Sequence, residues 1–109
     1  MLIPDERLER ALAKLAKTDT LAAELHANME RAEFKAKAVK DALFLRVDGS
    51  SATERAAKAG ASQDYQDAME TYFAALQAYE TLKNERAREV IVIECWRSMN
   101  SARTKGLLQ

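Results

Sequence analysis

The sequence predicts an all-α protein, and its composition and apolar patterning support this. Of the 109 residues, 48% are apolar and 31% charged, with only three glycines and one proline. Apolar residues recur at alternating spacings of four and three, as on one face of a helix. A β protein of this length would need turn residues about every ten positions. We therefore expect a single helical domain over residues 1–109, with long helices and few turns.

The first predicted helix is short and begins at the only proline. Pro4 suits the first turn, where a backbone N–H is not needed, and the acidic Asp5 and Glu6 favour the positive end of the helix dipole. The run Thr-Asp-Thr at 18–20 offers three side chains that can cap a new helix. We therefore predict a break or a sharp bend at 18–20. The apolar stripe before the break consists of Leu8, Leu12 and Leu15.

The second predicted helix runs from about 21 to 47 and carries a coiled-coil stripe. The segment 48–51 closes this helix, and Gly49 can take the left-handed conformation there. Ser51 and Glu54 form a capping-box pattern for a short connector helix over 52–59, which Gly60 should end. The stripe consists of Leu21, Leu25, Met29, Ala32, Ala36, Val39 and Leu43.

The last predicted helix spans about 63–103 and packs antiparallel to the second. Its stripe reaches a polar segment at 83–89 and resumes at 90–96, where four successive β-branched residues could also form a buried strand. We favour a helix there because the sequence offers no second strand to pair with it. The first part of the stripe consists of Tyr65, Met69, Tyr72, Leu76 and Tyr79.

The unequal lengths of the two long helices predict self-association. A helix of some 60 Å cannot bury both ends of its stripe against one shorter partner. We expect the overhanging apolar residues to form a coiled-coil-like homo-oligomer. The candidate oligomer interface consists of Leu76, Tyr79, Val90, Ile93 and Trp96.

The net charge is zero, with 17 basic and 17 acidic residues, but the charges are segregated. Residues 31–46 and 83–105 are basic, whereas 48–80 is acidic. Two basic stretches on one side of an assembly would attract a nucleic-acid backbone. The alternative is a solvated helix surface with pairs of opposite charge four residues apart. The candidate nucleic-acid-binding residues are Lys35, Lys37, Lys40, Arg46, Arg86, Arg97, Arg103 and Lys105.

Catalysis finds little support. With only Cys95 and His26, the chain can form neither an internal disulfide nor a Cys/His zinc site, and we expect no catalytic residue, metal or cofactor. Carboxylates three residues apart at 30 and 33, and at 64, 67 and 70, leave one enzymatic alternative, an all-α magnesium-dependent nucleotide pyrophosphohydrolase.

No apolar run suggests a membrane span or a signal peptide, which favours a cytoplasmic protein without membrane contact.

Three segments carry a resemblance to a known family. The string VIECWRSMNSARTKG at 92–106 follows a helix with tyrosines every seven residues and a polar connector at 49–55. These features resemble small helical phage proteins, and the plan is similar to UvsY-type recombination mediators: a basic helix, a glycine-containing connector, and a long last helix with a late tryptophan.

The resemblance implies an oligomer that works without a cofactor in the host cell cytoplasm. It implies binding of single-stranded DNA, of a recombinase and of a single-strand-binding protein. The DNA contacts would come from Lys35, Lys37, Lys40 and Arg46 in the basic helix. The alternative function is a protein-binding inhibitor or adaptor of host machinery that uses the acidic segment 64–80 and does not touch DNA.

Overall fold

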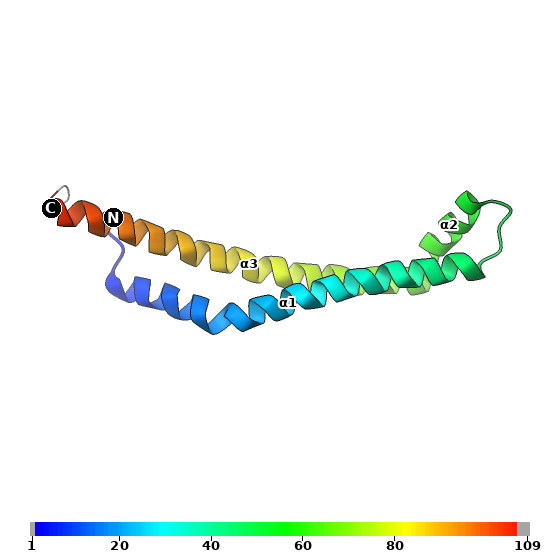
Figure 1. The fold of residues 1–109 in the computed structure, drawn as a ribbon, viewed down its shortest axis with the longest axis horizontal. Helices are drawn as coiled ribbons and strands as arrows, with labels where there is room; N and C mark the ends of the chain where they lie inside the picture. Colours follow the sequence, from blue (N-terminus) through cyan, green and yellow to red (C-terminus); the bar gives the residue numbers. More distant parts are fainter. Residues whose placement is uncertain (1, 107–109) are drawn as a thin grey trace. The chain divides into compact units, whose positions relative to one another are not determined.

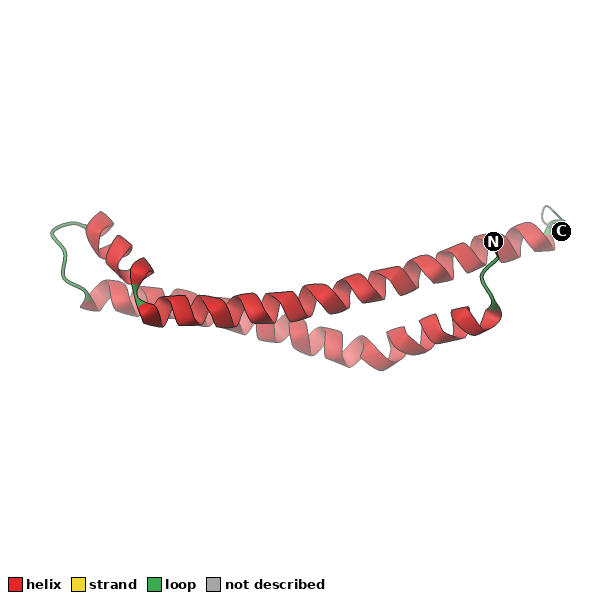
Figure 2. Ribbon diagram, turned by 180° about the vertical axis from the view of Figure 1, so that it is seen from behind, coloured by secondary structure: helices red, strands yellow, loops and turns green. Residues whose placement is uncertain are grey.

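The computed structural model describes residues 2–106, and these are almost entirely helical (Figure 1). The helices are α1 (Asp5–Arg46), α2 (Ala52–Ala61) and α3 (Gln63–Thr104). No strand occurs within residues 2–106 (Figure 2). The all-α prediction is confirmed, and the β-branched run at 90–96 lies inside α3 as a helix.

The chain divides into two compact units, each containing part of α1 and part of α3. Unit 1 combines the chain up to Ala23 with the chain from Glu80 onward, and unit 2 spans Glu24–Tyr79. In the following we call the residues of α1 and α3 that face each other within a unit the seam.

Of the predicted break or sharp bend at 18–20, the break is wrong, because α1 continues through these residues as one helix. The Thr18 hydroxyl donates a hydrogen bond to the Lys14 carbonyl within the helix, at 2.6 Å, instead of capping a new one. The half-buried Ala22, and not the 44% exposed Leu21, continues the four-three spacing from Thr18 to Leu25. The four-three spacing of seam residues therefore continues without a shift through 18–25, and the helix is not interrupted there.

In unit 2, α1 and α3 pack antiparallel with a register that advances seven residues at a time. The His26 and Tyr79 rings lie 5.1 Å apart, and the Lys40 ammonium lies 5.4 Å from the Tyr65 ring centre. Between these pairs, burial and then the nearby Glu33 carboxylate raise the pKa of Tyr72. The predicted tyrosine row thus faces one polar residue of α1 at each heptad. The buried apolar residues of this unit are Ala32, Ala36, Leu43 and Ala59.

In unit 1, the seam of α3 passes through the polar segment 83–89 without a gap. Leu82 is 8% exposed and Glu89 only 9%, whereas Val90 is 42% exposed. Continuing the spacing of three and four from Tyr79 leads to Leu82, Arg86 and Glu89, and then to Ile93 and Trp96. Two of the five seam positions are therefore charged.

The connector between α1 and α2 confirms the capping prediction and corrects the one for glycine. The Glu54 backbone N–H donates to the Ser51 hydroxyl at 3.1 Å, and its carboxylate accepts from the Ser50 N–H at 3.0 Å. Within residues 2–106, only Gly106 has a positive φ, so Gly49 is not left-handed. A Cβ at Gly49 would instead lie 2.6 Å from the Arg55 Cγ, so glycine is required there by close approach.

Glycine also does not end α2 as predicted. The helix runs through Gly60 to Ala61, and it ends where the Ser62 N–H donates to the Ala59 carbonyl at 3.2 Å. Ala59 itself is completely buried in unit 2. The short helix is therefore docked on its unit by an alanine, and its end is set at Ser62.

Replacing Ser51 with alanine should destabilise α2 by about 1 kcal/mol, because the Glu54 N–H loses its acceptor. Amide hydrogen exchange in residues 52–61 measures this local effect and should speed up several-fold. The control is Thr53→Ala, which changes an exposed residue of the same turn. Equal protection of α2 in wild type and Ser51→Ala would show that the cap is not needed.

Candidate nucleic-acid interface and the polar layer of unit 1

A concave surface that includes a predicted binding residue lies in unit 2. A groove of about 440 Å³ runs between α1 and α3. Its lining is apolar at the floor and basic along the α1 side. We call this the basic groove, and it is lined by Asn28, Arg31, Ala32, Lys35, Val39, Ala68 and Thr71.

The charge in the basic groove comes from two adjacent turns of α1. The Arg31 Nη1 donates to the Asn28 Oδ1 at 3.0 Å, which orients the guanidinium, and Lys35 is exposed one turn later. Arg31 and Lys35 are four residues apart and thus share one face of the helix. A guanidinium and an ammonium over an apolar floor are the groups that hold a phosphate backbone while a sugar or base lies against the helix.

The other predicted basic residues of unit 2 lie outside the basic groove. Lys37 is exposed and forms an ion pair of 3.5 Å with Glu33, so it shows the i,i+4 pairing expected of a solvated surface. Lys40 lies against the Tyr65 ring, and Arg46 is exposed in the last turn of α1. Of the four candidates in this helix, Lys35 thus lines the basic groove and the other three do not.

In unit 1, the last turns of α3 bring two predicted residues to one shallow depression. Arg97 and Lys105 line it with Ser98, Ser101 and Ala102, over a volume of about 430 Å³. Arg103 is exposed on the same stretch of helix. Two cations and two hydroxyls form a second surface suited to phosphate oxygens, although it has a smaller apolar floor than the basic groove.

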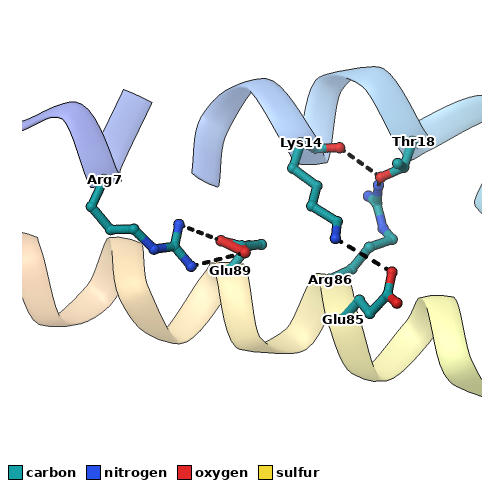
Figure 3. Close-up of polar contacts among 6 residues, drawn as sticks. All are labelled: Arg7, Lys14, Thr18, Glu85, Arg86 and Glu89. Atoms are coloured by element: carbon teal, nitrogen blue, oxygen red, sulfur yellow. Dashed lines mark hydrogen bonds and ion pairs between the residues drawn. The ribbon is translucent and has the colours of Figure 1, made fainter. Parts of the chain in front are cut away.

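Arg86, predicted to contact nucleic acid, is instead engaged with α1 (Figure 3). Its Nη1 donates to the Thr18 hydroxyl at 2.7 Å and to the Leu15 carbonyl at 2.9 Å. Its Nη2 lies 3.5 Å from the Asp19 carboxylate. Three of its contacts thus hold the two helices of unit 1 together, and a phosphate would have to displace them.

Arg86 belongs to a group of five charged residues and one threonine in the seam that we call the polar layer (Figure 3). The Arg7 Nη2 donates to the Glu89 Oε1 at 2.9 Å, and the Arg7 Nη1 lies 2.7 Å from the other carboxylate oxygen. The Lys14 ammonium lies 3.4 Å from Glu85. The polar layer consists of Arg7, Lys14, Thr18, Glu85, Arg86 and Glu89.

The charges of the polar layer stabilise one another. The hydrogen bond from Arg7 lowers the pKa of Glu89 below its ordinary value of 4.5, against the opposing effect of burial, and the charges of Arg7, Lys14 and Arg88 add to this. The same hydrogen bond raises the pKa of Arg7. Both groups are therefore charged at neutral pH, and each compensates the other for the loss of water.

Sequence reasoning missed the polar layer, although a signal was present. Segment 83–89 interrupts the apolar stripe, which suggested an exposed surface. Counting the heptad onward from Tyr79 places Arg86 and Glu89 in the seam, opposite an α1 stretch that holds Arg7 and Lys14. A pair of opposite charges at seam positions can specify the register of two helices. The heptad spacing of Arg86 and Glu89 was the signal that could have revealed this pair.

Most residues of the predicted oligomer interface lie in the seams between α1 and α3. Leu76 and Ile93 are half-buried, Tyr79 contacts His26, and the Trp96 Nε1 donates to the Asp5 carboxylate at 3.1 Å. Val90 remains 42% exposed, and its neighbour Ile91 is 57% exposed. Four of the five predicted residues thus contribute to seams of the single chain, and Val90 points away from them.

The carboxylates of the enzymatic alternative are spread over several contacts. Glu30 pairs with His26 at 3.3 Å, Glu33 pairs with Lys37, and Asp67 accepts from Gln63 at 2.7 Å. Within the described part of the chain, no group of three His, Cys, Asp or Glu residues could hold a metal ion.

Among residues 2–106, no helix has both the length and the apolar character needed to cross a membrane.

Comparison with protein-family models, with curated proteins and with solved structures gave no match to this chain.

Proposed function

We propose that this chain is a non-enzymatic, self-associating accessory protein that binds single-stranded nucleic acid, with a recombination mediator as its most specific form. The observation that carries the proposal is the basic groove of unit 2. Arg31 and Lys35 stand there beside an apolar floor, without an acidic residue among the lining. A chain of zero net charge can bind phosphates only through such a local concentration of positive charge.

The shape and lining of the basic groove favour a single strand over a duplex. A floor of Ala32, Val39 and Ala68 offers contact to the faces of bases, which a duplex keeps paired and stacked in its interior. The groove contains no aromatic ring to stack a base and few side chains to read base edges. We therefore infer binding that depends on the backbone and is tolerant of sequence.

The depression at the end of α3 supplies a second phosphate contact in the same proposal. Arg97 and Lys105 belong to unit 1, whereas the basic groove belongs to unit 2. Each surface alone can neutralise only a few phosphates, and self-association multiplies the number that one strand meets. Linked weak sites bind far more tightly than each alone, which connects the two parts of the proposed function.

Affinity for single-stranded DNA should fall steeply with salt, and Lys35→Glu should weaken it by about tenfold or more at low salt, because a phosphate loses a cation and meets an anion. Fluorescence anisotropy of a labelled oligonucleotide between about 50 and 200 mM salt measures both effects. The matched control is Lys17→Glu, which reverses an exposed lysine of α1 in unit 1. Absence of binding by the wild type at about 50 mM salt would overturn the proposal.

A specific observation favours one alternative, binding of a protein partner by the acidic part of α3. Phe73 is 49% exposed beside the acidic Glu70, and its ring lies 5.5 Å from that of Tyr72. An exposed aromatic ring with acidic neighbours suits a basic partner protein. This adaptor function predicts no DNA binding, and it becomes the leading candidate if the wild type binds no DNA at about 50 mM salt.

A further inference from the structure

The outer face of α1 in unit 2 carries two large apolar side chains that the chain leaves uncovered. Phe34 is 74% exposed and Leu45 is 78% exposed. They are eleven residues apart, which is three helical turns, so they share one face. This face lies opposite the seam, where Ala36 and Leu43 are buried. We call it the outer stripe, and it contains Phe34, Ala38, Asp41 and Leu45.

The order of residues along the outer stripe is complementary to itself. A two-fold axis midway between Ala38 and Asp41 turns α1 onto an antiparallel copy. Phe34 then lies opposite Leu45 of the second copy, and Leu45 opposite Phe34. Small Ala38 near the axis allows the two backbones to approach, while the large side chains fill both ends. An isologous interface requires this kind of symmetry in one surface patch.

The charges beside the outer stripe obey the same two-fold relation. Lys37 and Asp41 are one turn apart on one border of the stripe, and both are exposed. The two-fold axis places Lys37 at nearly the same height along the helix as Asp41 of the second copy, with an offset of one residue. The symmetry produces this pair of opposite charges twice. Lys37 has a weak surface pair with Glu33 at 3.5 Å, which it can exchange at low cost.

We propose that the outer stripe is the self-association surface, and that it takes the α1 helix of a second copy in antiparallel orientation. This inference rests on the self-association part of the proposed function, and it does not require nucleic-acid binding. It differs from the sequence-based interface, most of whose members lie in the seams. The basic groove borders the outer stripe along one side, because Arg31 lies about 60° and Lys35 about 100° around the helix from Phe34.

Sedimentation velocity over a micromolar concentration series tests the proposal. The wild type should form a dimer, and Phe34→Ala should weaken its association by about tenfold or more, since a large apolar side chain is lost from both ends of the contact. The control is Phe73→Ala, an exposed phenylalanine of α3 outside the outer stripe, which should leave association unchanged. A monomeric wild type, or equal weakening by both variants, would overturn the proposal.

A charge exchange tests the antiparallel orientation. Lys37→Asp and Asp41→Lys should each weaken the dimer, because like charges then meet across the axis, and the double variant should restore it. Far-UV circular dichroism confirms that each variant is helical. A double variant no better than the single ones would overturn the orientation. Sedimentation of Lys35→Glu separates the proposals, since this variant loses a cation of the basic groove and should associate like the wild type.

Discussion

Leu82→Ala should lower the free energy of unfolding by about 2 to 4 kcal/mol, through lost apolar contact and a cavity in unit 1. Leu82 is 8% exposed. Within residues 2–106, the buried apolar side chains are four alanines and only two leucines. A single leucine therefore supplies a large share of the burial that opposes unfolding, in a domain whose total stability is typically about 5 to 15 kcal/mol.

Urea unfolding followed by circular dichroism, at one fixed protein concentration, measures this loss. The matched control is Leu12→Ala, since Leu12 also belongs to unit 1 but is 50% exposed. That change should cost less than about 1 kcal/mol. Similar losses in the two variants would mean that Leu82 is no more important to the fold than a surface leucine.

Glu89→Gln should destabilise the protein at neutral pH and flatten its response to acid. The Arg7 hydrogen bond holds the pKa of Glu89 below 4.5 in the folded state, so the unfolded chain binds this proton first as the pH falls. The stabilising contribution is complete above pH 4.5 and is lost as the pH drops through the folded value. Glutamine removes it, and proton uptake on unfolding near pH 4 should decrease by up to about one per chain.

Unfolding curves between pH 3 and 7 measure this, with Glu94→Gln as the control at an exposed glutamate of the same helix. Glu54 contributes in the same direction, because bonds from Ser50 lower its pKa, and it is unchanged in both variants. Identical acid curves for Glu89→Gln and Glu94→Gln would contradict the prediction.

The single variant Arg7→Met should also destabilise the protein more than the double variant Arg7→Met with Glu89→Met, since the single change leaves a carboxylate buried without its guanidinium.

The fold was predictable where one rule acts alone, and harder to predict where two compete. Apolar spacing, with no second strand candidate, correctly assigned the run 90–96 to a helix. At 18–20, capping residues competed with an unbroken heptad, and the heptad prevailed because Thr18 bonds within its own helix. At Gly49, the usual left-handed role was wrong, since the glycine is required by the side chain of Arg55, which is distant from it in the turn.

The candidate site was predictable only in part, for a related reason. Basic residues can be counted along a sequence, but their partners come from the other helix. Lys35 and Arg97 line grooves, whereas Arg86 is held by Thr18 and Leu15. Arg31 was counted in the basic stretch but not named as a contact, and its role in the groove depends on α3 residues nearly forty positions away.

The alanines of the seam have a consequence for how this sequence can change over time. Ala11, Ala32 and Ala36 are already among the smallest residues, so substitution at these positions can hardly create a cavity. Almost every replacement is an enlargement, which pushes the two helices apart along their whole contact. Tolerance to mutation should therefore be asymmetric: the seam accepts glycine or serine more readily than valine or leucine, even though the larger residues are more hydrophobic.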